Sequence, residues 1–253
     1  MMKKLETICR SALAMLLMMC AFAVAVKSQS SPPPTQEQEF LDSIRKGNAT
    51  RVGELLKQNP NLIKATTGNG TTAVLAAVYS GHDEIAELLL ATGIEPNIFE
   101  AAATGRLDRV RVLLDKNPEL VKAYSPDGWT VLHLGFGSVD LVKLLLDRGA
   151  DINAVSKNRL TATPLQGTAK FKTIDSARLL IERGANVNGR GEQGRTPLHE
   201  VAANGQIEFA RLLLDHGADI NAKDGNGKTP LTIALENKQT EMATFLRGRN
   251  GSQ

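Results

Sequence analysis

The hydrophobic residues of this chain form short runs that recur along the sequence. In the run from Ile207 to Leu214, apolar residues lie three or four positions apart, which places them on one face of a helix. Gly205 precedes this run and Gly217 follows it, and glycine is the residue that most readily ends a helix or reverses the chain. The pattern predicts pairs of short helices joined by tight turns.

A fixed phrase opens four of these pairs. The phrases read TVLH, TPLQ, TPLH and TPLT, and they begin 33 residues apart at Thr130, Thr163, Thr196 and Thr229. A threonine can cap a helix by accepting a bond from a free amide of the first turn, and proline fits the first helical position because it has no amide. Three closing phrases follow the second helices: RGADIN, RGANVN and HGADIN, starting at Arg148, Arg183 and His216. A period of this size predicts a solenoid of stacked units.

These phrases resemble the ankyrin repeat, whose signature is TPLH followed by a helix pair and a GADVN turn. The resemblance implies an all-α solenoid of stacked helix pairs with short β-hairpin-like fingers. We expect it to occupy residues 39–248, with residues 249–253 as a tail. Structural roles are expected for the residues of the phrase, namely Thr130, His133, Thr163, Pro164, Thr196, Pro197, His199, Thr229 and Pro230.

The repeat departs from its period in two places. Upstream, the phrase beginning at Asn59 recurs at Asn117, a shift of 58, which predicts about seven units in which the first and third lack the finger. The last unit is expected to be a C-terminal cap, because a solenoid's final unit has no neighbour to cover it. Between Thr130 and Thr163, a loss of two residues around 134–137 is matched by a gain of two around 157–159.

The N-terminus has the pattern of an export signal. Lys3, Lys4 and Arg10 precede an uncharged stretch from Ser11 to Val26, which is short for a membrane-spanning helix. We expect residues 1–25 to be a cleaved signal peptide and residues 26–38, rich in serine and proline, to be a disordered tether. The chain is then exported to the periplasm or beyond, as in exported bacterial ankyrin proteins, without membrane insertion after cleavage. An uncleaved anchor is the alternative.

Charge and side-chain chemistry argue against several classes of function. Without the signal peptide the chain has 27 basic and 26 acidic residues, whereas nucleic-acid binding requires a basic face. The four histidines do not pair at metal-ligand spacing, and both cysteines lie in the signal segment. We therefore expect no catalytic residues, no metal and no cofactor.

Departures from the repeat indicate where a partner protein binds. The ankyrin pattern implies that partners contact the finger tips and the end of each first helix. The expected contact residues are Tyr79, Trp129, Lys157, Asn158, Arg159, Phe171, Glu192, Arg195, Asn226 and Lys228. The aromatic residues in this set suit a hot spot. The alternative is structural: the rings fill gaps left by shortened helices, and the insertion near Lys157 is a neutral loop.

The sequence leaves three hypotheses for the function of the chain. The first is a monomeric, non-enzymatic scaffold that binds a protein partner through a preorganised surface. The second is an accessory, inhibitory or protective partner of an envelope enzyme. The third is a hydrolase or metalloenzyme, for which the sequence shows no constellation of residues.

Overall fold

The computed structural model describes residues 34–250. The chain divides into a segment ending at Glu39 and a compact unit from Phe40 onward. The predicted signal peptide, the tether up to residue 33 and the last three residues of the tail lie outside the described residues. Residues 36–38, expected in the tether, are helical, because Thr35 and Gln38 cap the helix start with reciprocal bonds of 2.8 and 3.2 Å.

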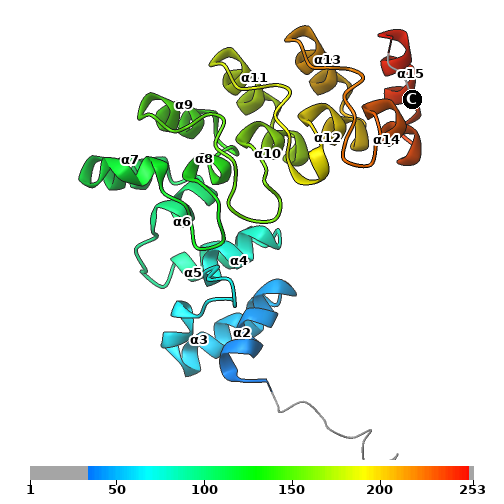
Figure 1. Ribbon diagram of the computed structural model, residues 1–253. Coiled ribbons are helices and arrows are strands. Elements are labelled where there is room, and N and C mark those ends of the chain that lie inside the picture. Colours follow the sequence, from blue (N-terminus) through cyan, green and yellow to red (C-terminus); the bar gives the residue numbers. More distant parts are fainter. Residues whose placement is uncertain (1–33, 251–253) are drawn as a thin grey trace, which may run out of the picture. The chain divides into compact units, whose positions relative to one another are not determined.

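Seven helix pairs make up the described chain, which Figure 1 shows as two rows. The inner row contains α2 (Gln36–Arg45), α4 (Ala73–Tyr79), α6 (Ile98–Ala103), α8 (Val131–Leu134), α10 (Pro164–Phe171), α12 (Pro197–Ala203) and α14 (Pro230–Glu236). The outer row contains α3 (Ala49–Gln58), α5 (Asp83–Leu90), α7 (Leu107–Lys116), α9 (Val139–Asp147), α11 (Ile174–Glu182), α13 (Ile207–Asp215) and α15 (Thr240–Gly248). Short 3-10 turns are η1 (Pro60–Lys64), η2 (Pro118–Lys122) and η3 (Glu192–Gly194). The expected all-α solenoid is confirmed.

Local chemistry explains the helix boundaries. Thr163 accepts a bond from the Gln166 amide at the start of α10, and Pro164 takes the first helical position. At the turn between the two helices of a unit, Gly205 adopts a left-handed φ of 68°. Lys172 and Lys238 stand at the corresponding turns with φ of 63° and 58°, a conformation that disfavours a side chain.

The buried apolar side chains form two clusters. One extends from Phe40 to Leu90 in the first two units, and the other from Ile98 to Leu246 in the remaining five. The break lies in the segment between α5 and α6, where no finger is formed. Asn97 instead caps α6 in a reciprocal arrangement with Glu100. The third unit is thus joined to the second without a finger.

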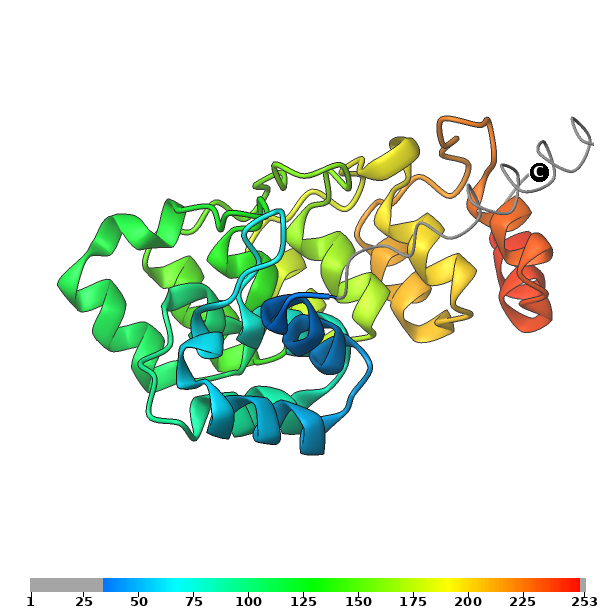
Figure 2. The same ribbon diagram turned by 90° about the horizontal axis from the view of Figure 1, so that it is seen from below.

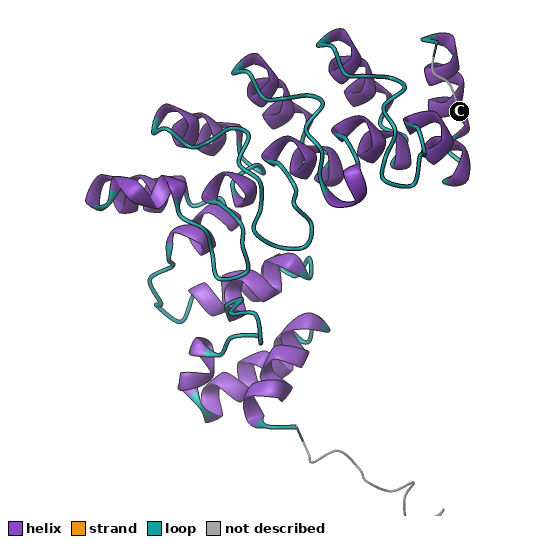
Figure 3. Cartoon of the chain, in the orientation of Figure 1, coloured by secondary structure: helices purple, strands orange, loops and turns teal. Residues whose placement is uncertain are grey.

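Five fingers connect the other units, and Figure 3 shows them as loops between helices. We number them by the unit they open: two (66–72), four (124–130), five (155–163), six (190–196) and seven (223–229). In four of them, the backbone N–H of one residue donates to the carbonyl four positions later, as in Ser125 to Trp129 at 2.8 Å. In finger five the bond spans six positions, from Ser156 to Ala162 at 2.9 Å. The extra two residues are the insertion that the spacing predicts.

Strand-type pairing in the described chain is limited to isolated bridges, Thr66 with Thr72 and Tyr124 with Thr130. The fingers are therefore single tight turns, and only two of them resemble hairpins. Their turns are too short for a longer ladder to form. Figure 2 shows the fingers side by side along one edge of the solenoid.

Candidate functional site

In the phrases of units four, five and six, the fourth residue links one unit to the next. His133 Nε2 lies 2.8 Å from the Ala162 carbonyl, and His199 Nε2 lies 3.0 Å from the Lys228 carbonyl. In both rings Nδ1 accepts from the backbone amide of the phrase threonine, so Nε2 carries the proton. Burial lowers the pKa of His133 to about 4 and also lowers that of His199. These rings are neutral structural links that belong to the fold.

Glutamine performs the same task in unit five. Gln166 Oε1 accepts from the Thr163 amide at 2.9 Å, and its Nε2 donates to the Arg195 carbonyl at 2.7 Å. Each of these carbonyls belongs to the residue before the next unit's threonine. The phrase thus fixes the base of the following finger.

Finger four is connected to unit two, because unit three has no finger between them. The Asp127 carboxylate accepts from Thr71 Oγ1 at 3.4 Å and from Ser125 Oγ at 2.5 Å. The Tyr79 hydroxyl also bonds to Asp127, and burial together with this carboxylate raises the pKa of the Tyr79 phenol. Tyr79 is nevertheless 45% exposed, at the end of α4.

Trp129 lies at the end of finger four and is only partly exposed. Its ring packs against His133, with centroids 5.4 Å apart. Its backbone closes the finger through the Ser125 amide and hydroxyl. Most of the indole therefore supports the phrase of unit four, and a smaller part remains available to a partner.

The predicted contact residues of finger five separate into two groups. Asn158 is used within the fold, since its amide donates to the Asp127 carbonyl at 3.1 Å and its oxygen accepts from the Leu160 amide at 3.1 Å. Lys157 and Arg159 are exposed. The Lys157 ammonium lies 4.0 Å from the centre of the Tyr124 ring, a cation–π contact that positions it.

Phe171 is the most exposed of the large hydrophobic residues in the described chain, at 61%. It ends α10, as Tyr79 ends α4, and its ring stacks on Phe136 with centroids 5.1 Å apart and an interplanar angle of 27°. Phe136 follows the shortened helix α8 and also lies against Gly167, where an added Cβ would be 3.2 Å from the ring. The two rings form an aromatic pair at the ends of adjacent inner helices.

In fingers six and seven, two of the predicted contact residues form ion pairs within the fold. Arg195 Nε lies 3.1 Å from Glu200, and Lys228 Nζ lies 2.7 Å from Glu236. Glu192 and Asn226 are exposed. Arg190, which the sequence reading did not select, donates from Nη1 to the carbonyls of Gly194 and Lys223 at 2.9 and 2.7 Å.

Comparison with known proteins identifies the repeat. The family described as "Ankyrin repeats (3 copies)" matches residues 98–156, 134–224 and 165–253, and the single "Ankyrin repeat" matches residues 69–100. The chain belongs to the ankyrin repeat family. Ankyrin repeats mediate contacts between proteins and are generally non-enzymatic.

Several relatives share part of this ankyrin solenoid. Ankyrin repeat and SAM domain-containing protein 6 of Mus musculus is 47% identical over 139 residues, covering 53% of this chain and 13% of that protein. Mitochondrial disaggregase of Bos taurus is 29% identical over 158 residues, covering 57% and 23%. NAD-capped RNA hydrolase NUDT12 of Homo sapiens is 31% identical over 70 residues, covering 28% and 15%. The chain spans less than a quarter of the length of each of these relatives.

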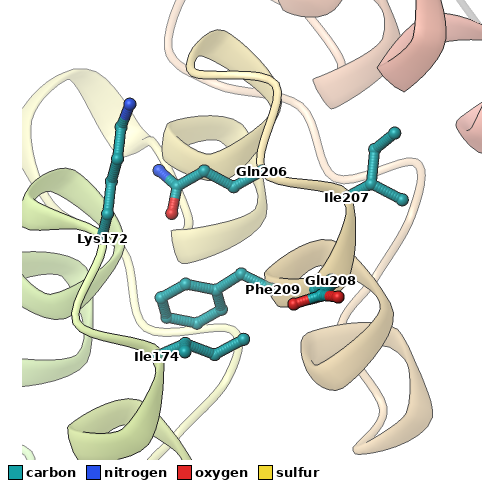
Figure 4. Close-up of a pocket in the computed structure, with 6 residues that line it drawn as sticks. All are labelled: Lys172, Ile174, Gln206, Ile207, Glu208 and Phe209. Carbon is teal, nitrogen blue, oxygen red and sulfur yellow. The ribbon is translucent and has the colours of Figure 1, made fainter.

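Within residues 34–250, no group of three His, Cys, Asp or Glu side chains is placed to hold a metal ion. No helix in that range combines the length and apolarity needed to cross a bilayer. A pocket of about 240 Å³ lies between the turn at Lys172 and the start of α13 (Figure 4), but the Gln206 amide beside it already donates to the Ala169 carbonyl.

The candidate surface also includes Phe136 and Arg190, which the sequence did not predict. Phe136 lies in the stretch where unit four loses two residues, and that irregularity was the only signal for it. Arg190 lies in the finger before η3, but nothing in its sequence context indicates that it reaches the next finger. The candidate surface comprises the exposed aromatic residues of the inner row and the exposed residues of fingers five to seven.

Proposed function

We propose that this ankyrin solenoid is a non-enzymatic scaffold that binds a protein partner through the inner helix row and the fingers. The aromatic pair of Phe136 and Phe171 carries the proposal. Phe171 is 61% exposed, so its side chain contributes little to the stability of the fold. If a partner covered it, the same side chain would bury a large apolar area in the interface.

The surface around this pair is rigid before binding. The phrase links from His133, Gln166 and His199 hold each finger base, and backbone bonds close each finger. A preordered surface loses little conformational entropy when a partner docks. Tyr79 extends the aromatic surface toward the N-terminal units, with its hydroxyl anchored on Asp127.

We place this scaffold outside the cytoplasm, in the bacterial envelope or beyond, as a monomer. The basic head and apolar stretch of residues 1–26 support this location. The test of location is N-terminal sequencing of the protein from its native host, where a start near residue 26 is expected. An intact N-terminus would contradict cleavage.

Site-specific photocrosslinking tests the binding surface. A photoreactive phenylalanine analogue replaces Phe171 in one variant and Val112 in another. Val112 is a matched control, since it is also an exposed apolar residue, at 42%, but lies on outer helix α7. We expect a discrete protein adduct from position 171. An excess of unlabelled wild type should suppress this adduct by competition, whereas an excess of Phe136→Ala/Phe171→Ala should not. Identical adducts from both positions, or none from position 171, would refute the assignment.

A further inference from the structure

Fingers five to seven carry an excess of positive charge. Their basic residues are Lys157, Arg159, Arg190, Arg195, Lys223 and Lys228, against the acidic residues Glu192 and Asp224. Two of the six, Arg195 and Lys228, are neutralised by carboxylates of the inner helices. The other four have no carboxylate within ion-pair distance in the described chain. We call Lys157, Arg159, Arg190 and Lys223 the basic ridge.

The guanidinium of Arg190 is held in place without being neutralised. Its Nη1 donates to a carbonyl of its own finger and to the Lys223 carbonyl of finger seven, at 2.9 and 2.7 Å. A second bond joins the same two fingers, from the Gly225 amide to the Gln193 carbonyl at 2.6 Å. Carbonyl oxygens carry no net charge, so the cation remains available to an anion. Its planar fork suits a carboxylate, and its fixed position reduces the entropy lost on binding.

The cations of finger five lie in the same row of fingers. Lys157 is positioned over the Tyr124 ring, and its backbone amide donates to the Gly128 carbonyl of finger four at 2.7 Å. Arg159 is exposed in the inserted part of the finger. The row in Figure 2 places fingers five, six and seven consecutively along one edge. Exposed positive charge therefore recurs in three consecutive fingers.

We infer that the basic ridge binds an acidic segment of the partner protein, lying across fingers five to seven. This inference rests on the proposed function and specifies the chemistry of the partner. Nucleic acid fits the surface less well, because binding of single strands relies on aromatic rings that stack on bases. On the adjoining finger four, the Trp129 ring packs on His133 and the Tyr124 ring lies under Lys157.

A random twelve-residue peptide library displayed on phage, selected on the full chain, provides the test. We expect the selected peptides to be rich in Asp and Glu and to bind more weakly as ionic strength rises, because exposed charges are screened by salt. The test variant is Arg159→Glu/Lys223→Glu, because neither side chain forms a hydrogen bond or ion pair within the described chain. The matched control is Arg111→Glu/Arg178→Glu, which makes the same charge change on outer helices α7 and α11.

For acidic peptides, the test variant is expected to weaken binding more than about tenfold. It removes two charge attractions, each of which raises affinity by up to about fivefold, and it adds repulsion between like charges. The control is expected to leave affinity within about twofold. Arg190→Gln, which removes the cation, should also weaken binding of the acidic peptides.

The outcomes separate this inference from the proposed function. Selected peptides that are neutral or basic, and whose binding is lost in Phe136→Ala/Phe171→Ala, would overturn the inference of an acidic partner segment while the scaffold proposal stands. A labelled single-stranded RNA of equal charge that binds more tightly than the peptides would also overturn it. No enrichment on the wild-type chain over an unrelated protein would count against both.

Discussion

The buried histidines of the phrase should make the stability of the solenoid depend on pH. His133 is 3% exposed, and burial lowers its pKa from 6.5 to about 4, although the Ala162 carbonyl and the charge of Asp151 act in the opposite direction. In the folded state it is therefore neutral between pH 6.5 and 4, whereas the unfolded chain binds a proton there. Folding stability then falls as pH is lowered through this window and is fully present above pH 6.5.

The magnitude follows from the size of the shift. Each pKa unit corresponds to about 1.4 kcal/mol, so lowering the pH from 6.5 to 4 removes about 3 kcal/mol through His133. His199 adds to the loss in the same direction, because burial lowers its pKa as well, with Arg195 and Arg190 acting in the same sense and the Lys228 carbonyl and Asp224 opposing.

Unit five supplies the variant that isolates this effect. Gln166 makes both bonds of the phrase without a titrating group, so His133→Gln/His199→Gln should keep the inter-unit links. We expect a loss of about 1 kcal/mol at pH 7 from poorer packing, including the contact of His133 with Trp129. Between pH 6.5 and 4 the variant should lose about 3 kcal/mol less than wild type, or more once His199 is counted.

The assay is urea unfolding followed by helical circular dichroism at several pH values from 7 to 4. The reverse change, Gln166→His, serves as the control and should increase the loss on acidification. If the double variant and wild type lose the same stability between pH 6.5 and 4, the histidines are not the origin of the pH dependence. That result would refute the reasoning even if the protein were acid-sensitive for other reasons.

Three further predictions concern stability and can be checked by the same unfolding assay at pH 7. Lys172→Gly should stabilise the chain by about 1 kcal/mol, because Lys172 has a φ of 63° at a turn where unit six has Gly205; no gain would show that the turn is unstrained. Leu213→Ala, at a fully buried position of α13, should cost about 2 to 5 kcal/mol, and a cost below about 1 would contradict its place in the core. Gly128→Ala should cost about 2 kcal/mol or more, because φ is 88° and the new Cβ would lie 2.8 Å from the Lys157 backbone; Gly68→Ala, where no atom lies within 4 Å, is the control.

Much of the ankyrin fold could be predicted because its signals are local. Thr163 and Pro164 set the start of a helix within a few residues, and Gly205 reverses the chain by its own conformational freedom. The insertion in finger five was predicted from spacing alone, and the bond from Ser156 to Ala162 bears it out. The expectation of hairpin-like fingers held only for the two fingers that form bridges.

The candidate site was less predictable, because exposure depends on contacts between units. The predicted partner contacts Asn158, Arg195 and Lys228 also make bonds within the fold that the sequence did not indicate, the first to the Asp127 carbonyl and the other two to inner-helix glutamates. Phe136 had no repeat position to identify it, and only the stacking of units four and five brings it onto Phe171.

The sequence by itself determined the repeat, its helix pairs and the inserted finger, because caps, turns and apolar periods act over a few residues. Only the tertiary structure decided which side chains remain available to a partner. Tyr79 meets Asp127 across a unit that has no finger, and Arg190 reaches the carbonyl of Lys223 in the next finger. Such contacts join residues of different units, and they form only when stacking of the apolar faces brings those units together.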